Sequence, residues 1–486
     1  MLKKLTFFIV IVLIGILGFM IGKTLQVESY QLNEVDPPVG VTLDEDVIVQ
    51  RFANSLTYET HVLPSGETND AAFMAFHQFL KSEFPLVFSE LQVEYVNDWS
   101  LLITWSGSDT GLDPIVLMGH LDVVSASQPD RWKFPPFAGI IENDIVWGRG
   151  SIDNKNNVMA LLETAEKLLE EGYDPKRSII FSFGHDEETS GLNGAQEIVH
   201  ILSERDVKPS FVLDEGGMIL DGQLPVGSPV AFVANAEKGY VSLRLTARSQ
   251  GGHSSSPPTR TAVGMLAEAV YLIQENPFPA SISGATEDMM RYLAPELPFT
   301  QRFMLTNLWL TRPLMLQFYE SSERTNAMIR TTIAPTMMSG SETENVLPTE
   351  AYVVINFRIM PGETVQSVIK RITQVIDNDE IEITINRKGT GVDPSSVSSV
   401  EGEGFRQLQY TIKQLYPDAV VTPMLMIAAT DSRYFTRISD QVFRFTPVHL
   451  NSEEMASFHA IDEHIHRDKY LTMIAFYHQL LLNMTE

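Results

Sequence analysis

Short apolar strands alternate with amphipathic helices between residues 101 and 213, and this rhythm constrains the fold more than any other feature of the sequence. Four apolar runs have the length and composition of buried strands: 101–105, 114–118, 178–183 and 210–213. Helical patterns lie between them, over 158–171 and 195–202. Strands that alternate with helices predict an α/β domain whose mostly parallel sheet is covered by helices on both faces.

The rhythm changes near Gly239. Residues 241–247 alternate apolar and polar side chains, as a half-exposed antiparallel strand does. A helix, a strand, a helix and a strand are then expected at 261–275, 352–359, 364–376 and 381–385. This order predicts a small α+β domain inserted as a lid. After about residue 395 the mixed α/β pattern returns and ends in a long helix over 469–482.

We therefore expect one catalytic domain that is split by an insertion. The predicted boundaries are an N-terminal anchor at 1–30, a first catalytic part at 31–238, the lid at 239–395 and a second catalytic part at 396–486. Residues 24–40 are polar and contain Pro37-Pro38, which is typical of a linker.

An apolar run from Leu5 to Gly22 follows Lys3 and Lys4 and is closed by Lys23. As a helix it would be about 27 Å long, close to the hydrocarbon thickness of a bilayer. A cleaved signal peptide is the alternative, but the small-residue cleavage pattern is poor. We expect an uncleaved single-pass anchor with the catalytic part outside the cytosol, in a periplasmic, extracellular or lumenal space.

The composition excludes several kinds of chemistry. The chain has 486 residues, a formal net charge of −27 and no cysteine. Such an acidic balance argues against nucleic acid or an anionic membrane surface as a partner. Without cysteine there can be no disulfide, no thiolate metal site and no cysteine nucleophile. Transition-metal chemistry in this chain must use His, Asp and Glu.

Metal-type side chains stand where successive strands end. His120 and Asp122 follow the strand at 114–118, and Glu187-Glu188 and Asp214 follow the next two, while Asp153 lies in a Gly-rich loop that enters a helix. The carboxyl ends of parallel strands meet at one edge, where open α/β sheets build their sites. Oxygen and nitrogen ligands without sulfur suit zinc, cobalt or manganese, and several shared carboxylates suggest two ions.

Each of these residues also has an ordinary structural explanation. A single histidine at a strand end is more often hydrogen-bonded structure than a ligand. Glu187-Glu188 could form a solvated turn, and Asp153 could cap a helix. Taken together, these explanations account poorly for a run of strands that all end in metal-type side chains.

Six ordered motifs resemble the aminoacylase / carboxypeptidase S family of di-zinc amidohydrolases. They lie at 120–122, 148–153, 186–191, 214–217, 252–254 and 459–463. The longer phrases at 184–188, 214–220, 325–331 and 356–362 are most similar to the branch of carboxypeptidase S and the N-fatty-acyl-amino-acid synthase/hydrolase. The likeness covers the chain from near Leu43 to its end and implies a zinc-exopeptidase-like catalytic domain.

The resemblance implies a role for each site residue. His120 and Asp214 would bind one zinc, His459 and Glu188 the other, and Asp153 would bridge the two, with a cis peptide after Asp153. Glu187 would be the general base that takes a proton from the bridging water. Asp122 would hydrogen-bond the second nitrogen of His120 and fix its tautomer.

Further residues are expected in substrate binding. His253 would stabilise the oxyanion, from its own chain or across a homodimer, or it would only cap a loop. Arg433 would receive the free carboxylate of the substrate, and Asn326 and Arg358 are lid candidates. Asp462 stands where relatives commonly have Asn, so an extra negative charge is expected beside His459.

Two functional classes follow. The first is a membrane-anchored di-zinc amidohydrolase that cleaves, or in reverse forms, the amide of an N-acyl amino acid, with a carboxypeptidase on short peptides as the alternative. The second is a non-catalytic module that binds metal or a partner. The apolar stretch 299–318 could line a lipophilic groove, but such a run is more often a buried helix.

Overall fold

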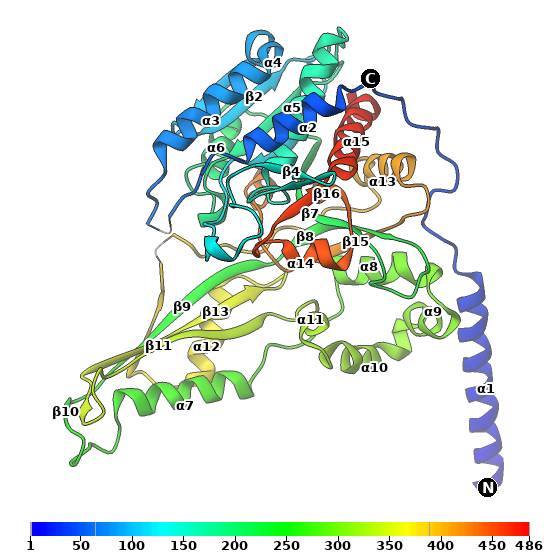
Figure 1. Ribbon diagram of the computed structural model, residues 1–486. Coiled ribbons are helices and arrows are strands. Elements are labelled where there is room, and N and C mark those ends of the chain that lie inside the picture. Colours follow the sequence, from blue (N-terminus) through cyan, green and yellow to red (C-terminus); the bar gives the residue numbers. More distant parts are fainter. Residues whose placement is uncertain (1, 64, 388, 486) are drawn as a thin grey trace.

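The computed structural model describes residues 2–63, 65–387 and 389–485. Its main sheet has eight strands in the order β1-β2-β6-β3-β7-β16-β8-β15 (Figure 1). In that order the strands are β1 (Gln92–Val96), β2 (Ser100–Trp105), β6 (Ile179–Gly184), β3 (Ile115–His120), β7 (Phe211–Leu220), β16 (Val442–Leu450), β8 (Val230–Glu237) and β15 (Val420–Met426). The strands come from two separate parts of the chain, 92–237 and 420–450.

The centre of this sheet is parallel and its margins are mixed. β6, β3, β7 and β16 run parallel to one another, whereas β1–β2 and β2–β6 are antiparallel. β8 pairs in parallel with β15 and meets β16 in antiparallel fashion. The predicted α/β class with a mostly parallel sheet is confirmed.

Helices cover both faces of the main sheet because its central strands are apolar on both sides. On β3, Ile115 and Leu117 belong to the core beneath α5 and α15, while Val116 and Met118 belong to the core beneath α6. The first face is covered by α2 (Glu45–Ser55), α3 (Asp70–Glu83), α4 (Pro85–Glu90), α5 (Lys155–Glu170), α13 (Glu403–Leu415) and α15 (Arg467–Thr485). The other face is covered by α6 (Ala195–Glu204).

A second sheet lies below the first in Figure 1 and has the order β11-β13-β9-β14. Its strands are β11 (Thr332–Ser339), β13 (Glu350–Ile359), β9 (Gly239–Arg248) and β14 (Ile381–Ile385). All of their pairings are antiparallel, and α7 (Ala262–Glu275) and α12 (Val365–Ile376) pack on the sheet in a separate apolar core. β11 was not predicted, because its exposed side chains and Pro335 hide the strand pattern.

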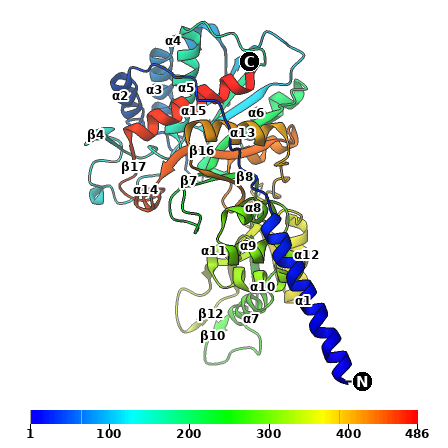
Figure 2. The same ribbon diagram turned by 90° about the vertical axis from the view of Figure 1, so that its right-hand side faces the viewer.

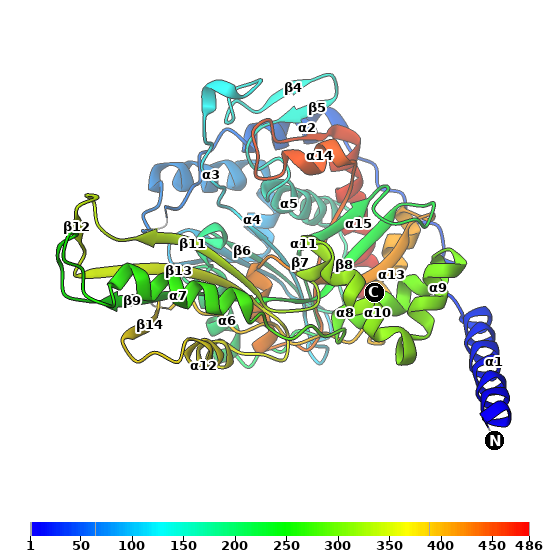
Figure 3. The same ribbon diagram turned by 90° about the horizontal axis from the view of Figure 1, so that it is seen from below.

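Residues 285–326 form helices that join the two sheets. α8 (Ala285–Leu293) packs beside β15, where Met289 and Leu293 meet Val230 and Val420. α9 (Phe299–Thr306), α10 (Leu308–Glu320) and α11 (Glu323–Asn326) follow. Seen from below, the strands of the second sheet extend to one side while α9 and α10 lie toward α1 (Figure 3).

Short elements complete the fold. They are β4 (Ile140–Glu142), β5 (Ile145–Trp147) and β17 (His464–His466) in one small sheet, β10 (Gly252–His253) and β12 (Val346–Leu347) in a ribbon, and α14 (Ser452–Ser457).

The N-terminal helix α1 (Leu2–Gln26) is long and apolar enough to cross a membrane, and it projects from the body of the molecule (Figure 2). The segment that follows is held along the body. The side-chain amide of Gln31 donates to the carbonyl of Val421 at 2.9 Å and accepts from its N–H at 2.8 Å. The ring of Tyr30 stacks on that of Tyr292 with centroids 4.7 Å apart.

Candidate metal centre

The carboxyl ends of the central strands gather the metal-type side chains at one edge of the main sheet. β3 ends at His120, β6 leads into the turn that contains Glu187 and Glu188, and β7 passes through Glu215. The loop before α5 contributes Asp153, and the loop after α14 contributes His459. This is the edge at which parallel sheets place their sites.

Two groups of potential ligands share Asp153. In one, the Nε2 atom of His120 lies 2.9 Å from Asp153 Oδ1 and 3.3 Å from Glu215 Oε1. In the other, the Nε2 atom of His459 lies 2.5 Å from Asp153 Oδ2 and 3.5 Å from Glu188 Oε1. Within each group the donor atoms lie within 4.8 Å of one another. A carboxylate shared between two such groups is the arrangement expected of a dinuclear centre.

Glu215 takes the place that was predicted for Asp214. The Asp214 carboxylate is occupied elsewhere, since it accepts the N–H groups of Glu215 and Ser432 at 2.9 and 2.8 Å. The prediction placed the end of the strand at residue 213, but β7 continues to Leu220. Adjacent residues of a strand point to opposite faces, so only one of Asp214 and Glu215 can face His120.

Asp122 supports the site in two ways. His120 Nδ1 lies 2.9 Å from the backbone carbonyl of Asp122 and 3.4 Å from its carboxylate, so the carbonyl is the nearer partner. The carboxylate of Asp122 accepts the N–H groups of Glu187 and Glu188 at 3.2 and 3.1 Å. Asp122 therefore orients the ring of His120 and also holds the turn that presents both glutamates.

Glu463 and Asn154 position the shared aspartate, and the sequence assigned no role to either. One oxygen of Glu463 accepts the N–H groups of Ile152 and Asp153 at 2.7 and 3.1 Å, while the other pairs with buried Arg149. Asn154 accepts the N–H of His120 at 3.1 Å and donates to Glu215 at 2.6 Å. The peptide between Asp153 and Asn154 is cis, as the family resemblance implied.

The electrostatics of this cluster suit divalent cations. Burial and the charge of Asp153 raise the pKa of Glu188, and the same causes raise the pKa of Glu215 to about 8. Hydrogen bonds with Asp153 and Glu188 raise the pKa of His459 to about 10. The Oε1 atom of Glu188 is buried, and the Nε2 atom of His459 lies 3.5 Å from it. Three carboxylates and two histidines gathered in this way fit hard or borderline metal ions.

Glu187 lies beside the cluster and belongs to neither ligand group. Burial raises the pKa of Glu187 well above its usual range, and the negative charges of Glu215 and Asp431 raise it further. The nearby His120 acts in the opposite direction and lowers this pKa. A carboxylate with a raised pKa is suited to accept and return a proton near neutral pH.

Two of the predicted substrate residues, Arg433 and Arg358, lie near Glu187. Arg433 donates to the carbonyl of Ser190 at 2.8 Å, while its Nε is buried without a partner. Arg358 lies over the Tyr240 ring, 4.9 Å from its centroid. Burial and the positive charge of Arg433 lower the pKa of Arg358. The negative charge of Glu187 acts in the opposite direction and raises the pKa of both arginines. The side-chain oxygen of Asn326 is buried and lacks a hydrogen-bond partner.

Two predicted residues lie elsewhere. His253 is exposed on β10, at the end of the second sheet farthest from the main sheet (Figure 1), and pairs with Ser255 at 2.8 Å. The structure therefore does not bring His253 to the site of its own chain. The Asp462 carboxylate accepts the N–H of Lys133 at 2.6 Å, so it is engaged with that loop.

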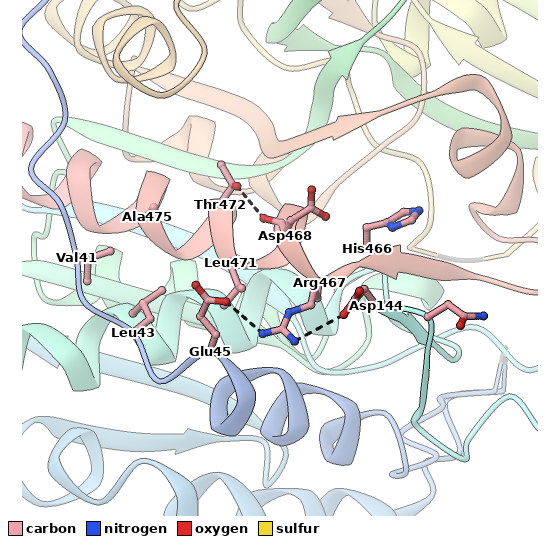
Figure 4. Close-up of a pocket in the computed structure, with 11 residues that line it drawn as sticks. Val41, Leu43, Glu45, Asp144, His466, Arg467, Asp468, Leu471, Thr472 and Ala475 are labelled. Atoms are coloured by element: carbon pink, nitrogen blue, oxygen red, sulfur yellow. Dashed lines mark hydrogen bonds and ion pairs between the residues drawn. The ribbon is translucent and has the colours of Figure 1, made fainter.

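A surface hollow of about 790 Å³ lies between α2 and α15 (Figure 4). Arg467 crosses it and pairs with Glu45 and Asp144. The described residues that line it include none of the predicted site residues. An open hollow that is bridged by surface ion pairs offers little to a ligand, so we place the active site at the metal-type cluster.

Lys238 yields a prediction of pH-dependent stability. Its buried ammonium group donates to the carbonyls of Ala327 and Arg330 at 2.9 and 2.8 Å. Burial and the charge of Arg358 lower its pKa to about 7. Because the unfolded chain keeps this proton to higher pH, Lys238 should make the free energy of unfolding rise with pH above about 7, by at most about 1.4 kcal/mol per pH unit.

In the Lys238→Met variant, the free energy of unfolding should rise less with pH than in the unaltered chain. The measurement is urea unfolding of both proteins at several pH values between about 7 and 9, which isolates Lys238 as the difference between two slopes. Equal slopes would contradict the assigned pKa.

Comparison with known proteins agrees with this geometry. Residues 116–483 match the family model described as peptidase family M20/M25/M40. The chain is 37% identical over 484 residues to the probable carboxypeptidase S-like 2 of Dictyostelium discoideum, covering 97% of this chain and 92% of the relative. It is 38% identical over 441 residues to the human N-fatty-acyl-amino acid synthase/hydrolase PM20D1, covering 89% of this chain and 87% of that relative.

Solved structures share the fold. The M20 family metallo-carboxypeptidase Sso-CP2 from Sulfolobus solfataricus superposes with a TM-score of 0.66 at 18% identity, covering 90% of this chain and 99% of that one. Human carnosine dipeptidase 1 gives a TM-score of 0.63 at 14% identity, covering 90% and 96%.

Proposed function

Because the chain belongs to peptidase family M20/M25/M40 and is a metallopeptidase-type amide hydrolase, we propose that it cleaves the amide bond of N-acyl amino acids. The observation that carries this proposal is Asp153, shared between two ligand groups beside the half-buried base candidate Glu187. The reverse reaction, synthesis of the amide, would use the same site.

We propose two zinc ions, with cobalt or manganese as substitutes. His120 and Glu215 would hold one, His459 and Glu188 the other, and Asp153 both. Bound ions would polarise the substrate carbonyl and lower the pKa of water. Glu215 replaces Asp214 in this ligand set because its oxygen lies next to His120.

The remaining steps belong to side chains of this protein. Glu187 takes a proton from the attacking water and delivers it to the leaving amine. Asp122 holds the backbone of Glu187 and the ring of His120 in place. Arg433, with Arg358 and Asn326, receives the free carboxylate of the amino acid, for which the forked guanidinium is suited.

Arg433→Lys should raise KM for an N-acyl amino acid by roughly tenfold to a hundredfold, since a charge-assisted hydrogen bond is worth about 1.5–3 kcal/mol. The matched substrate is the corresponding N-acyl amino acid amide, which has no carboxylate. The unaltered chain and the Arg433→Lys variant should hydrolyse this carboxylate-free substrate at equal rates. An equal loss of activity on both substrates would show that Arg433 has only a structural role.

The acyl side of the substrate is proposed to be a fatty chain, which the PM20D1 relatives and the apolar surface of α10 support. A carboxypeptidase acting on short peptides is the second candidate, because other relatives are named carboxypeptidase S-like. Hydrolysis of N-oleoyl-phenylalanine and of Gly-Leu by the same preparation decides between them. Turnover of the dipeptide alone would overturn the first candidate.

The location and assembly are proposals of the same kind. We propose that α1 anchors the chain in a membrane with the catalytic part outside the cytosol. A homodimer would give the exposed His253 a route to the site of a second chain, where it could stabilise the oxyanion.

A further inference from the structure

The apolar stretch 299–318 was expected to form a buried helix, but it forms α9, which is half-buried in most of its residues, and α10, which has one side exposed. The outward side of α10 consists of Trp309, Leu310, Pro313, Leu314, Gln317 and Phe318, and it ends in the exposed Glu320, which is ion-paired with Arg330. Trp309, Leu314 and Phe318 are 55, 59 and 64% exposed. The inward side holds Thr311, whose hydroxyl donates to the carbonyl of Met304 at 2.6 Å. We name the outward side the α10 stripe. A helix with its apolar side turned outward needs an apolar partner.

The α10 stripe lies beside the end of α1 that leaves the proposed membrane span. α9 packs against α1, and Asn307 between α9 and α10 donates to the carbonyl of Met20 and the hydroxyl of Thr24 at 3.3 and 3.1 Å. The Trp309 ring meets the Phe19 ring edge-on, with centroids 6.3 Å apart. In Figure 1, α10 runs across the direction of α1.

The contact with Phe19 gives the depth of the stripe. Phe19 lies within the apolar run that Lys23 closes, about 6 Å along the helix from that lysine. A membrane that contains α1 would therefore have its outer interfacial layer at Trp309. Tryptophan is enriched at this depth, where its ring is apolar and its N–H reaches water.

The charges of the segment agree with a membrane surface. Residues 297–319 contain Arg302 and Arg312 and no acidic residue, within a chain of net charge −27. Arg312 donates to the carbonyl of Ile282, so its head group is held on the body side of α10. The acidic residue that ends α10, Glu320, is ion-paired with Arg330, so the exposed apolar stripe carries no unpaired negative charge and fits an interfacial helix.

We propose that the α10 stripe lies in the outer interfacial layer of the membrane that holds α1, as a second, monotopic contact. The chain continues from α10 through a short turn into α11, which contains Asn326. Given the proposed function, this contact lets a lipid-borne N-acyl amino acid reach Asn326 and Arg433 with its acyl chain still in the membrane.

The depth of the α10 stripe can be measured because the chain has no cysteine. The full chain is reconstituted in vesicles of phosphatidylcholine, with one nitroxide label at Leu314→Cys, at Phe318→Cys or at the control Tyr95→Cys. Tyr95 is 51% exposed on β1, which pairs with β2, and Figure 1 shows β2 on the far side of the molecule from α1. Labels at 314 and 318 should collide more with oxygen than with a water-soluble nickel chelate, and the label at 95 should show the reverse. Equal nickel access at all three positions would overturn the proposal.

A second measurement connects the stripe to catalysis. The double variant Leu314→Glu/Phe318→Glu should turn over vesicle-borne N-oleoyl-phenylalanine about tenfold more slowly. Replacing two apolar side chains of the stripe by charged ones weakens its contact with the membrane. Turnover of water-soluble N-acetyl-phenylalanine by the variant should match that of the unaltered chain. Unchanged turnover of both substrates would refute the substrate route. If the unaltered chain hydrolyses neither, the proposed function fails, while the label depths still test the membrane contact.

Discussion

Replacing Glu187 by glutamine is expected to lower the turnover of N-oleoyl-phenylalanine by about 10²–10⁴-fold, the usual contribution of a positioned general base. Glutamine keeps the size of the side chain and removes only the capacity to accept a proton. Glu187 belongs to neither ligand group, so the metal content of the Glu187→Gln protein should stay at its original value. Initial rates and elemental analysis of the same sample measure both quantities.

The matched control for this variant is Glu204→Gln, an exposed glutamate at the end of α6. It should leave rate and metal content unchanged. Full activity in Glu187→Gln would remove Glu187 from the mechanism. If the unaltered chain, with its metal bound, hydrolyses none of the amides, the result would favour a non-catalytic metal-binding module.

The second large effect concerns the two adjacent acids on β7. Glu215→Gln is expected to release one of two bound ions, because Glu215 lies 3.3 Å from His120 in the first ligand group. Outer partners of metal ligands are worth 10–100-fold in affinity, and loss of a ligand should cost at least as much. The unfolding temperature should then respond less to added zinc, since a bound ion stabilises the folded state in proportion to RT ln(1 + [L]/Kd).

Asp214→Asn is the isosteric counterpart on the neighbouring residue. It should lower the unfolding temperature, because Asp214 accepts two backbone N–H groups, and it should keep both ions. Equilibrium dialysis against zinc followed by elemental analysis compares the two variants. Loss of an ion from Asp214→Asn together with full occupancy in Glu215→Gln would restore the assignment made from the sequence.

Much of the fold could be predicted because local pattern and global architecture agree. The apolar runs at 101–105, 114–118, 178–183 and 210–213 were predicted as strands and form β2, β3, β6 and β7, whereas β1, β8, β15 and β16 of the same sheet were not predicted. The strands β9 and β13 and the helix α12 were likewise predicted, since they alternate or repeat against one core. β11 escaped because it is exposed at the margin of its sheet and interrupted by Pro335.

The site was harder to predict where it depended on which way a side chain points. His120, Asp153, Glu188 and His459 come together as the motifs suggested. The choice between Asp214 and Glu215 depended on one strand continuing past its apolar part, which composition does not reveal. The role of Glu463 required knowing that the segment after His459 folds back onto the loop before Asp153. Likewise, whether the apolar residues of α10 face inward or outward depends on its neighbours.

We propose that this chain hydrolyses N-acyl amino acids at a dinuclear centre built on Asp153. The most direct measurement is the rate of N-oleoyl-phenylalanine hydrolysis by the full chain after removal of metal with a chelator, as zinc is added back in steps. We expect no turnover in the stripped protein and full recovery as two ions bind per chain. Undiminished turnover in the stripped protein, or no turnover of this substrate at full zinc occupancy, would contradict it.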